Sequence, residues 1–356
     1  SASVGDTIIF TDYARNWGTN GITIDSNGLN YQSRDDTFTI EYGTDGMTVA
    51  ITYMNATQGW VPTIDEAVAD APFKGNQEGI FGYGSGQVSM TNLVSSSGVV
   101  GTDVTGVGTG RNDLAACEYG DDKGIFGFGH DGSSYVSMTN LVSSSGVVAT
   151  DTTGVGTARG EIAACGYGGD KGIFGFGNTG SFTGVTNLVS NAGVVATDVT
   201  AVGTARGWVA ACEYGDDKGI FGFGQPSASV CDITNLVSNA GVVASDVTGV
   251  GTSRKTLAAC GYGGDKGIFG YGTTGTRVAT TNLVSNVGVV SADVTGVGTT
   301  RYGLGACEYG IDKGIFAYGN SSVTNVSNLV SNAGVVATDT TGVGTARSTL
   351  AACSFN

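Results

Sequence analysis

The segment LAACGYGGDKGIFGYG at residues 257–272 joins two short apolar stretches through a turn. Residues 257–260 are apolar, residues 264–266 read Gly-Asp-Lys, and residues 267–272 alternate glycine with large apolar side chains. Alternation with a period of two is typical of a β-strand, because successive side chains point to opposite faces. The segment therefore predicts a β-hairpin, and its glycines predict strands that pack closely against a neighbour.

This hairpin belongs to a unit that is repeated six times from residue 76 onward. The tripeptide Gly-Ile-Phe begins at residues 79, 124, 172, 219, 267 and 314. The motif Thr-Asn-Leu-Val-Ser, with serine first in the last copy, begins at residues 91, 139, 186, 234, 281 and 327. A third motif, Val-Gly-Thr-x-Arg, ends in Arg111, Arg159, Arg206, Arg254, Arg301 and Arg347. A repeat of about 40 to 50 residues is typical of solenoids and propellers.

Each repeat predicts four short strands: the two of the hairpin, Thr-Asn-Leu-Val, and Gly-Val-Val-x-x-Asp-Val-Thr. Frequent glycine makes a helix unfavourable, so each repeat is expected to consist of strands. A unit of four short strands is typical of one blade of a β-propeller. The first copy lacks its leading strand, whereas residues 348–353 supply one after the last copy. We therefore expect an all-β protein whose C-terminal strand pairs beside Gly79–Gly84 and closes a six-bladed propeller over residues 76–356.

Residues 1–63 contain no repeat and predict a separate, small N-terminal β-module. Alternating or β-branched runs occupy residues 7–10, 22–24, 37–40 and 48–53, and Asn-Gly and Asp-Gly turn signals separate them. Residues 64–75 are interpreted as a linker between this module and the repeats.

The composition excludes several classes of partner. The chain has 16 Lys and Arg against 31 Asp and Glu, a net charge of -15, which argues against binding nucleic acid or an anionic membrane. It contains no stretch of 18 apolar residues, so we expect no membrane insertion. With 40% apolar residues and 13% charged residues, the chain is expected to fold around a core rather than remain disordered.

The repeats resemble those of kelch-like proteins in three features: Thr-Ala-Arg before the first strand, its glycine-rich end, and an Ile-Phe-Gly-Phe-Gly second strand. They lack the tryptophan of the usual fourth kelch strand. The phrase YGGDKGIFGFG at residues 167–177, followed by Thr-Asn-Leu-Val-Ser-Asn, is similar to repeats in tail-associated proteins of tailed phages. The N-terminal module, from Gly5-Asp6-Thr7 to Gln58-Gly59-Trp60, resembles small β-modules of phage tail fibres.

This resemblance implies a virion structural protein of a tailed phage, a tail or fibre component made in the host cytoplasm. It implies that the N-terminal module contacts other virion proteins and that the propeller contacts a host-surface glycan or protein, or other virion proteins. Homo-oligomerisation is left open. The alternatives are an enzyme that acts on polysaccharide and a cellular, secreted adhesin or lectin-like protein.

The residues with reactive side chains predict no enzyme, no metal and no cofactor. One cysteine recurs in the first strand of each repeat, without the Cys-x-x-Cys pairs of metal sites, so buried thiols are expected. Cys231 lies outside this pattern, in a variable loop, and is also expected to be a free thiol. His130 is the only histidine, and it lies in a variable loop. An acid pair such as Asp113 and Glu161 remains the basis of the enzyme alternative.

Charges that recur once per repeat predict a structural role. A lysine follows an aspartate in five hairpin turns, and each motif arginine follows an aspartate by eight residues. Ion pairs and backbone hydrogen bonds between blades are expected from both sets.

Differences between the copies are concentrated after the second strand and directly after the motif arginine. In an up-and-down blade both of these connections emerge on one face, so we predict a chemically diverse recognition face. The alternative to a recognition face is that the loop sequences differ only through sequence drift at exposed positions. Aromatic residues there would stack on sugars or grip protein, and the acids and Arg277 would form hydrogen bonds. The predicted contact residues are Asp113, His130, Tyr135, Glu161, Phe182, Trp208, Arg277 and Tyr302.

Overall fold

The computed structural model describes residues 2–34, 40–67, 77–200 and 202–356. These residues form strands, turns and irregular segments, and no helix occurs among them. The chain divides into two compact units, Ser1–Phe73 and Lys74–Asn356. The fold is therefore all-β, as the sequence predicts.

The N-terminal unit contains two antiparallel sheets, in the orders β1-β4-β5 and β2-β3. Its strands are β1 (Thr7–Thr11), β2 (Ile22–Ile24), β3 (Ile40–Tyr42), β4 (Met47–Asn55) and β5 (Gly59–Ala67). Tyr31, Val49, Ile51, Tyr53 and Trp60 are buried together in its core. Strand β5 runs four residues past the predicted end of the module, because residues 59–67 pair with β4. The rest of the predicted linker and most of the predicted strand at 37–40 lie outside the described residues.

The repeat unit contains six antiparallel sheets of three strands each. The first strands, which carry the cysteines, are β8 (Ala115–Tyr119), β11 (Ala163–Tyr167), β14 (Ala210–Tyr214), β17 (Ala258–Tyr262), β20 (Gly305–Tyr309) and β23 (Ala351–Phe355). The second strands, which carry Gly-Ile-Phe, are β6 (Glu78–Gly82), β9 (Lys123–Gly127), β12 (Lys171–Gly175), β15 (Lys218–Gly224), β18 (Lys266–Gly270) and β21 (Lys313–Ala317). The third strands are β7 (Thr91–Val94), β10 (Thr139–Val142), β13 (Thr186–Val189), β16 (Cys231–Val237), β19 (Thr281–Val284) and β22 (Ser327–Val330).

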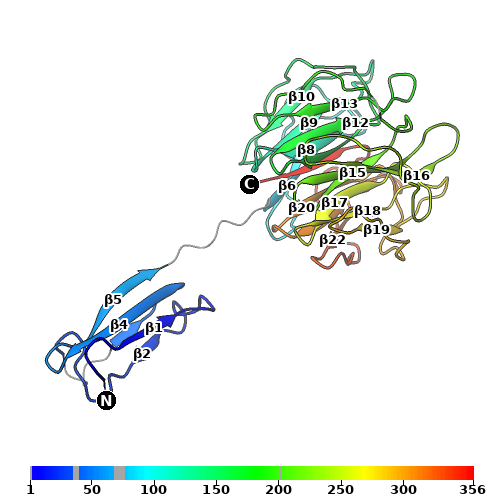
Figure 1. Cartoon of the computed structure of the whole chain (residues 1–356). Coiled ribbons are helices and arrows are strands. Elements are labelled where there is room, and N and C mark those ends of the chain that lie inside the picture. The colour runs from blue at the N-terminus through cyan, green and yellow to red at the C-terminus, as the bar shows by residue number, and fades with distance from the viewer. Residues whose placement is uncertain (1, 35–39, 68–76, 201) are drawn as a thin grey trace. The chain divides into compact units, whose positions relative to one another are not determined.

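The C-terminal strand completes the sheet of the first repeat. Strand β23 pairs with β6, with Ala351 opposite Gly82 and Cys353 opposite Ile80, so the predicted pairing is confirmed. In Figure 1 this red strand lies among the cyan and green strands of the first repeats. The first strands contact one another in the order β8, β11, β14, β17, β20 and β23, and β23 also contacts β8.

The predicted fourth strand of each repeat is not a regular strand. This segment makes only isolated bridges to the third strand, such as Val142 with Val148 and Thr139 with Thr152. The asparagine of the Thr-Asn-Leu-Val motif explains the difference, since its side chain takes over part of the pairing. Asn140 Nδ2 donates to the carbonyl of Ala149 at 3.0 Å and to the Asp151 carboxylate at 2.9 Å.

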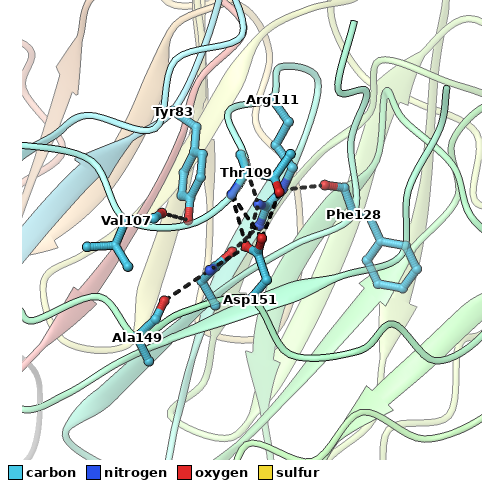
Figure 2. A network of polar contacts seen from close by, with 8 residues as sticks. Tyr83, Val107, Thr109, Arg111, Phe128, Ala149 and Asp151 are labelled. Carbon is cyan, nitrogen blue, oxygen red and sulfur yellow. Dashed lines mark hydrogen bonds and ion pairs between the residues drawn. The ribbon is translucent and has the colours of Figure 1, made fainter. Parts of the chain in front are cut away.

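The motif arginines join successive sheets, as Arg111 in Figure 2 illustrates. Its guanidinium lies over the Tyr83 ring of one sheet, 4.4 Å from the centroid. From there Nε donates to the carbonyl of Phe128 at 2.8 Å, and Nη2 donates to Oδ1 of Asn140 at 2.6 Å, both in the next sheet. The nearest acid is Asp151 of the following repeat, 3.9 Å away, rather than the aspartate eight residues earlier. The expected contact between repeats is therefore present, with a different acid.

Small residues in the strands make room for side chains of the neighbouring sheet. A Cβ on Gly172 would lie 2.5 Å from Cys117 Sγ, and one on Gly127 would lie 2.7 Å from the Phe174 ring. The seven cysteines are all free and buried, as expected. Cys231 is not in a loop, however, because the third strand of its sheet is extended and begins at this residue. An irregular register between Gly222 and Gly224 accompanies that extension.

The lysines of the hairpin turns pair within their own turn rather than between sheets. Lys171 contacts the preceding Asp170, and both side chains are partly exposed. Neighbouring turns are joined by backbone instead, since the Gly120 amide donates to the Asp170 carbonyl at 2.8 Å.

Candidate functional site

The two variable connections of each repeat lie side by side. The Asn112 amide donates to the carbonyl of His130 at 3.0 Å, and the His130 amide donates back to Asn112 at 2.8 Å. The same bridge links Gly160 with Asn178, and Tyr302 with Asn320. Residues after the motif arginine therefore meet residues after the second strand, at the opposite end of the strands from the uniform Gly-Asp-Lys turns.

At this end, six backbone hydrogen bonds connect residues that follow each motif arginine by two positions. Each amide donates to the carbonyl of its counterpart in another repeat, at 2.7 to 3.2 Å, and the series returns to its starting residue. All six residues have positive φ angles between 51° and 63°. In donor-to-acceptor order they are Asp113, Thr349, Gly303, Thr256, Trp208 and Glu161. We call this set the central circuit, and its side chains include three of the predicted contact residues.

The other predicted contact residues form pairs beside the central circuit. His130 and Tyr135 make an edge-to-face contact with 5.2 Å between ring centroids. Phe182 makes a similar contact with Trp208 at 5.8 Å. The guanidinium of Arg277 lies 5.8 Å from the ring centroid of Tyr302.

Most of these side chains form one continuous cluster, which we call the variable cluster. Its members, linked by ring contacts and charge interactions, are Asp113, His130, Tyr135, Glu161, Phe182, Trp208 and Lys255. Glycine brings neighbours close: a Cβ on Gly160 would lie 3.0 Å from the Tyr135 ring and 3.6 Å from Asp113 Cβ. A Cβ on Gly207 would lie 2.5 Å from the Glu161 carboxylate and 2.9 Å from the Phe182 ring. Arg277 and Tyr302 form a separate pair.

The two carboxyl groups of the variable cluster have raised pKa values. Burial raises the pKa of Asp113 to about 6, against the opposing effect of His130. Burial also raises the pKa of Glu161 to about 7, and the charge of Asp113 adds to this shift. The amide of Asn178 donates to Glu161 at 3.1 Å, and that of Asn112 donates to Asp113 at 2.8 Å. The acids therefore lie in a confined, amide-bearing environment where they can exchange protons near neutral pH.

Sequence reasoning missed several residues of this end. Lys255 lies over the Trp208 ring with Nζ 4.1 Å from the centroid, and its charge also acts on Glu161. The hydroxyls of Thr256 and Thr349 are buried without a hydrogen-bond partner. The signal that could have found these residues is their position, since each follows a motif arginine by one or two residues.

Comparison with models of known protein families finds no match, and neither does comparison with curated proteins. No three His, Cys, Asp or Glu side chains within the described ranges are arranged to hold a metal ion. The same ranges contain no helix that is long and apolar enough to cross a membrane.

Proposed function

We propose that residues 76–356 form a six-bladed, kelch-like β-propeller in a virion structural protein of a tailed phage. Six three-stranded sheets, the C-terminal strand paired in the first of them, and contacts that run from β8 around to β23 and back support the architecture. The sequence resemblance to phage tail-associated repeats supports the class of protein.

The propeller is proposed to recognise the host surface through the variable cluster. The observation that carries this proposal is that the positions at which the repeats differ lie together at one end of the strands. Tyr135, Phe182 and Trp208 supply aromatic surface, while Asp113, Glu161 and Lys255 supply hydrogen-bonding groups within the same cluster. Aromatic faces beside acids and amides are suited to the apolar faces and hydroxyls of a sugar.

The N-terminal module is proposed to attach the chain to other virion proteins. It contains a cleft of about 620 Å³ whose lining includes Phe10, Ile51 and Trp60. Apolar side chains are also exposed on this small unit, among them Ile9 at 63% and Tyr13 at 97%. A cleft lined mainly by apolar side chains is the usual form of a binding site, and it supports this proposal.

The test of recognition uses the purified full chain and bacterial cells of the host range. We expect the wild-type protein to bind cells and Tyr135→Ala to weaken that binding. Val147 is exposed and lies near the end of the strands that carries the uniform Gly-Asp-Lys turns, so Val147→Ala should leave binding unchanged. Equal binding by the two variants would contradict recognition by the variable cluster. Genes for capsid and portal proteins beside the coding sequence would support a phage origin, and their absence would favour the secreted adhesin.

A polysaccharide-cleaving activity is a second candidate, favoured by the pKa values of Asp113 and Glu161. Glycoside hydrolysis uses one carboxylic acid to protonate the leaving oxygen and one carboxylate to activate water or attack the sugar. Incubation with purified envelope polysaccharide would release reducing ends, and Glu161→Gln would abolish the release. If wild-type protein binds the polysaccharide without releasing fragments, the variable cluster is a binding site alone.

A further inference from the structure

Three glutamates occupy equivalent positions in alternate first strands. Glu118, Glu213 and Glu308 each follow the strand cysteine, in β8, β14 and β20. The intervening strands carry Gly166, Gly261 and Ser354 at this position. Because the first strands contact one another in sequence order and β23 contacts β8, each glutamate strand has a glycine or serine strand on both sides.

Glu213 and Glu308 depend sterically on the glycines beside them. A Cβ on Gly166 would lie 1.4 Å from Glu213 Oε1, and a Cβ on Gly261 would lie 1.5 Å from Glu308 Oε1. The backbone amides of Gly166 and Gly261 also hydrogen-bond to these carboxyl groups. Ser354 is held differently, since its hydroxyl accepts from the Glu308 amide at 2.8 Å and donates to the Glu308 carbonyl at 3.1 Å.

All three glutamates line one cavity of about 50 Å³ between the six first strands, which we call the central cavity. The six strand cysteines line it too, and burial raises the pKa of each of these thiols, so they stay neutral. At its edge, Tyr119, Asp121, Asp170 and Lys171 share a small pocket with Glu118 and Glu213. Lys171 is the only cation in the linings of these two spaces, and it already contacts Asp170.

The three glutamates are half-buried. Their partial burial is the largest cause that raises the pKa of Glu213 and Glu308 above the ordinary value, and the charge of Glu118 adds to both shifts. A protonated carboxyl costs little to bury, whereas several carboxylates in one small cavity repel one another. The chemistry of this cavity therefore changes with the number of protons that it holds.

We propose that Glu118, Glu213 and Glu308 act together as a pH-sensitive switch: protonated, they stabilise the contact of the six first strands, and ionised, they loosen it. The folded chain retains protons that the unfolded chain releases near pH 4 to 5. Stability from this source is complete below that range and is lost as the pH rises through the higher folded-state values.

The test is thermal unfolding of the full chain between pH 5 and pH 9. We expect the wild-type Tm to fall as the pH rises. The triple variant Glu118→Gln, Glu213→Gln and Glu308→Gln should have a shallower profile than the wild type, because glutamine has the shape of the protonated acid and keeps an acceptor for the glycine amides. Its remaining slope comes from Asp113, Glu161 and the buried thiols. Glu41→Gln, at an exposed position of the N-terminal module, is the matched control and should follow the wild type. Equal slopes for wild type and triple variant would overturn the proposal.

Three further measurements keep the test decisive. Asp113→Asn with Glu161→Gln removes the other acids that lose protons near neutral pH, and the wild-type slope above pH 7 should survive this change. Infrared spectra of this double variant at pH 7 should still contain a protonated carboxyl band even if the triple variant fails to fold, and absence of the band would overturn the proposal. Calcium that raises the Tm of the wild type but not of the triple variant at pH 9 would also overturn it, since the cavity would then hold a cation.

Discussion

The amide of Asp113 donates a hydrogen bond of 3.0 Å to the carbonyl of Thr349. Asp113 lies just before strand β8, and Thr349 lies just before the C-terminal strand β23. This bond joins the two ends of the repeat array at the variable end. Beside it, β23 pairs with β6, so the C-terminal segment is held both by a sheet and by the central circuit. The contact surface of the variable end therefore depends on the correct docking of the last residues of the chain.

Thr349 is expected to be a strained position. It is β-branched and has a φ of 51°, and its hydroxyl is buried without a partner. Left-handed backbone costs a residue other than glycine about 1 to 2 kcal/mol, part of which the entropy of an added glycine offsets. Thr349→Gly should therefore raise the free energy of unfolding by up to about 1 kcal/mol in urea titrations. Glycine already stands at the equivalent position 303.

Thr105→Gly is the control for this substitution, because Thr105 is exposed and its φ is not positive. It should lower stability slightly. Equal losses in the two variants would show that the φ angle of Thr349 carries no strain.

Arg111 is expected to contribute strongly to stability, because its fully buried guanidinium connects two sheets. Arg111→Ala leaves the carbonyl of Phe128 and Oδ1 of Asn140 without their donor, and Asp151 without the cation 3.9 Å away. Removal of one partner from a buried ionic network typically costs about 3 to 5 kcal/mol. Urea unfolding should show a loss of this size. Arg111→Lys should recover only part of it, since an ammonium cannot reproduce the planar fork of donors.

Lys171→Ala is the comparison for Arg111. Lys171 pairs with Asp170 at the surface, where such a pair contributes less than about 1 kcal/mol. Similar losses for the two variants would mean that the arginine network is not a main source of stability.

Sequence patterns were sufficient where one interaction dominates. The alternation of glycine with large residues predicted β18, and the missing first strand of the first repeat predicted the pairing of β23 with β6. The patterns failed where side chains compete with backbone pairing, as Asn140 does in the fourth segment. The left-handed backbone of the central circuit was not predicted either, because the position two residues after each motif arginine is occupied by side chains as different as those of Trp208 and Thr256.

Asp113 and Glu161 should make stability depend on pH. Their pKa values are about 6 and about 7 in the folded chain, above the ordinary values of 3.8 and 4.5. The stability that the bound protons provide is complete below about pH 4 and is lost as the pH rises to about 7. Solvent reduces the effect at these half-buried groups, so we expect about 1 to 2 kcal/mol in all. Chemical unfolding at pH 4 and pH 7 measures the difference.

The double variant Asp113→Asn with Glu161→Gln should lose that part of the pH dependence, while Asp216→Asn, at an exposed turn position, should keep it. An unchanged pH profile in the double variant would show that the two acids titrate normally.

Trp208 and Tyr302 provide the sharpest test of the variable end, because they differ in their surroundings. Trp208 contacts Phe182 and Lys255 within the variable cluster, whereas Tyr302 lies apart with Arg277. Loss of a central aromatic anchor typically costs an interface about 2 kcal/mol or more. Because the proposed site is the variable cluster, Trp208→Ala should weaken binding to host cells more than tenfold, with little change in Tm, whereas Tyr302→Ala should weaken it less. If Trp208→Ala alone has this effect, the ligand is confined to the variable cluster. If both variants bind normally while residues 1–63 prove essential, the recognition site does not lie at the variable end.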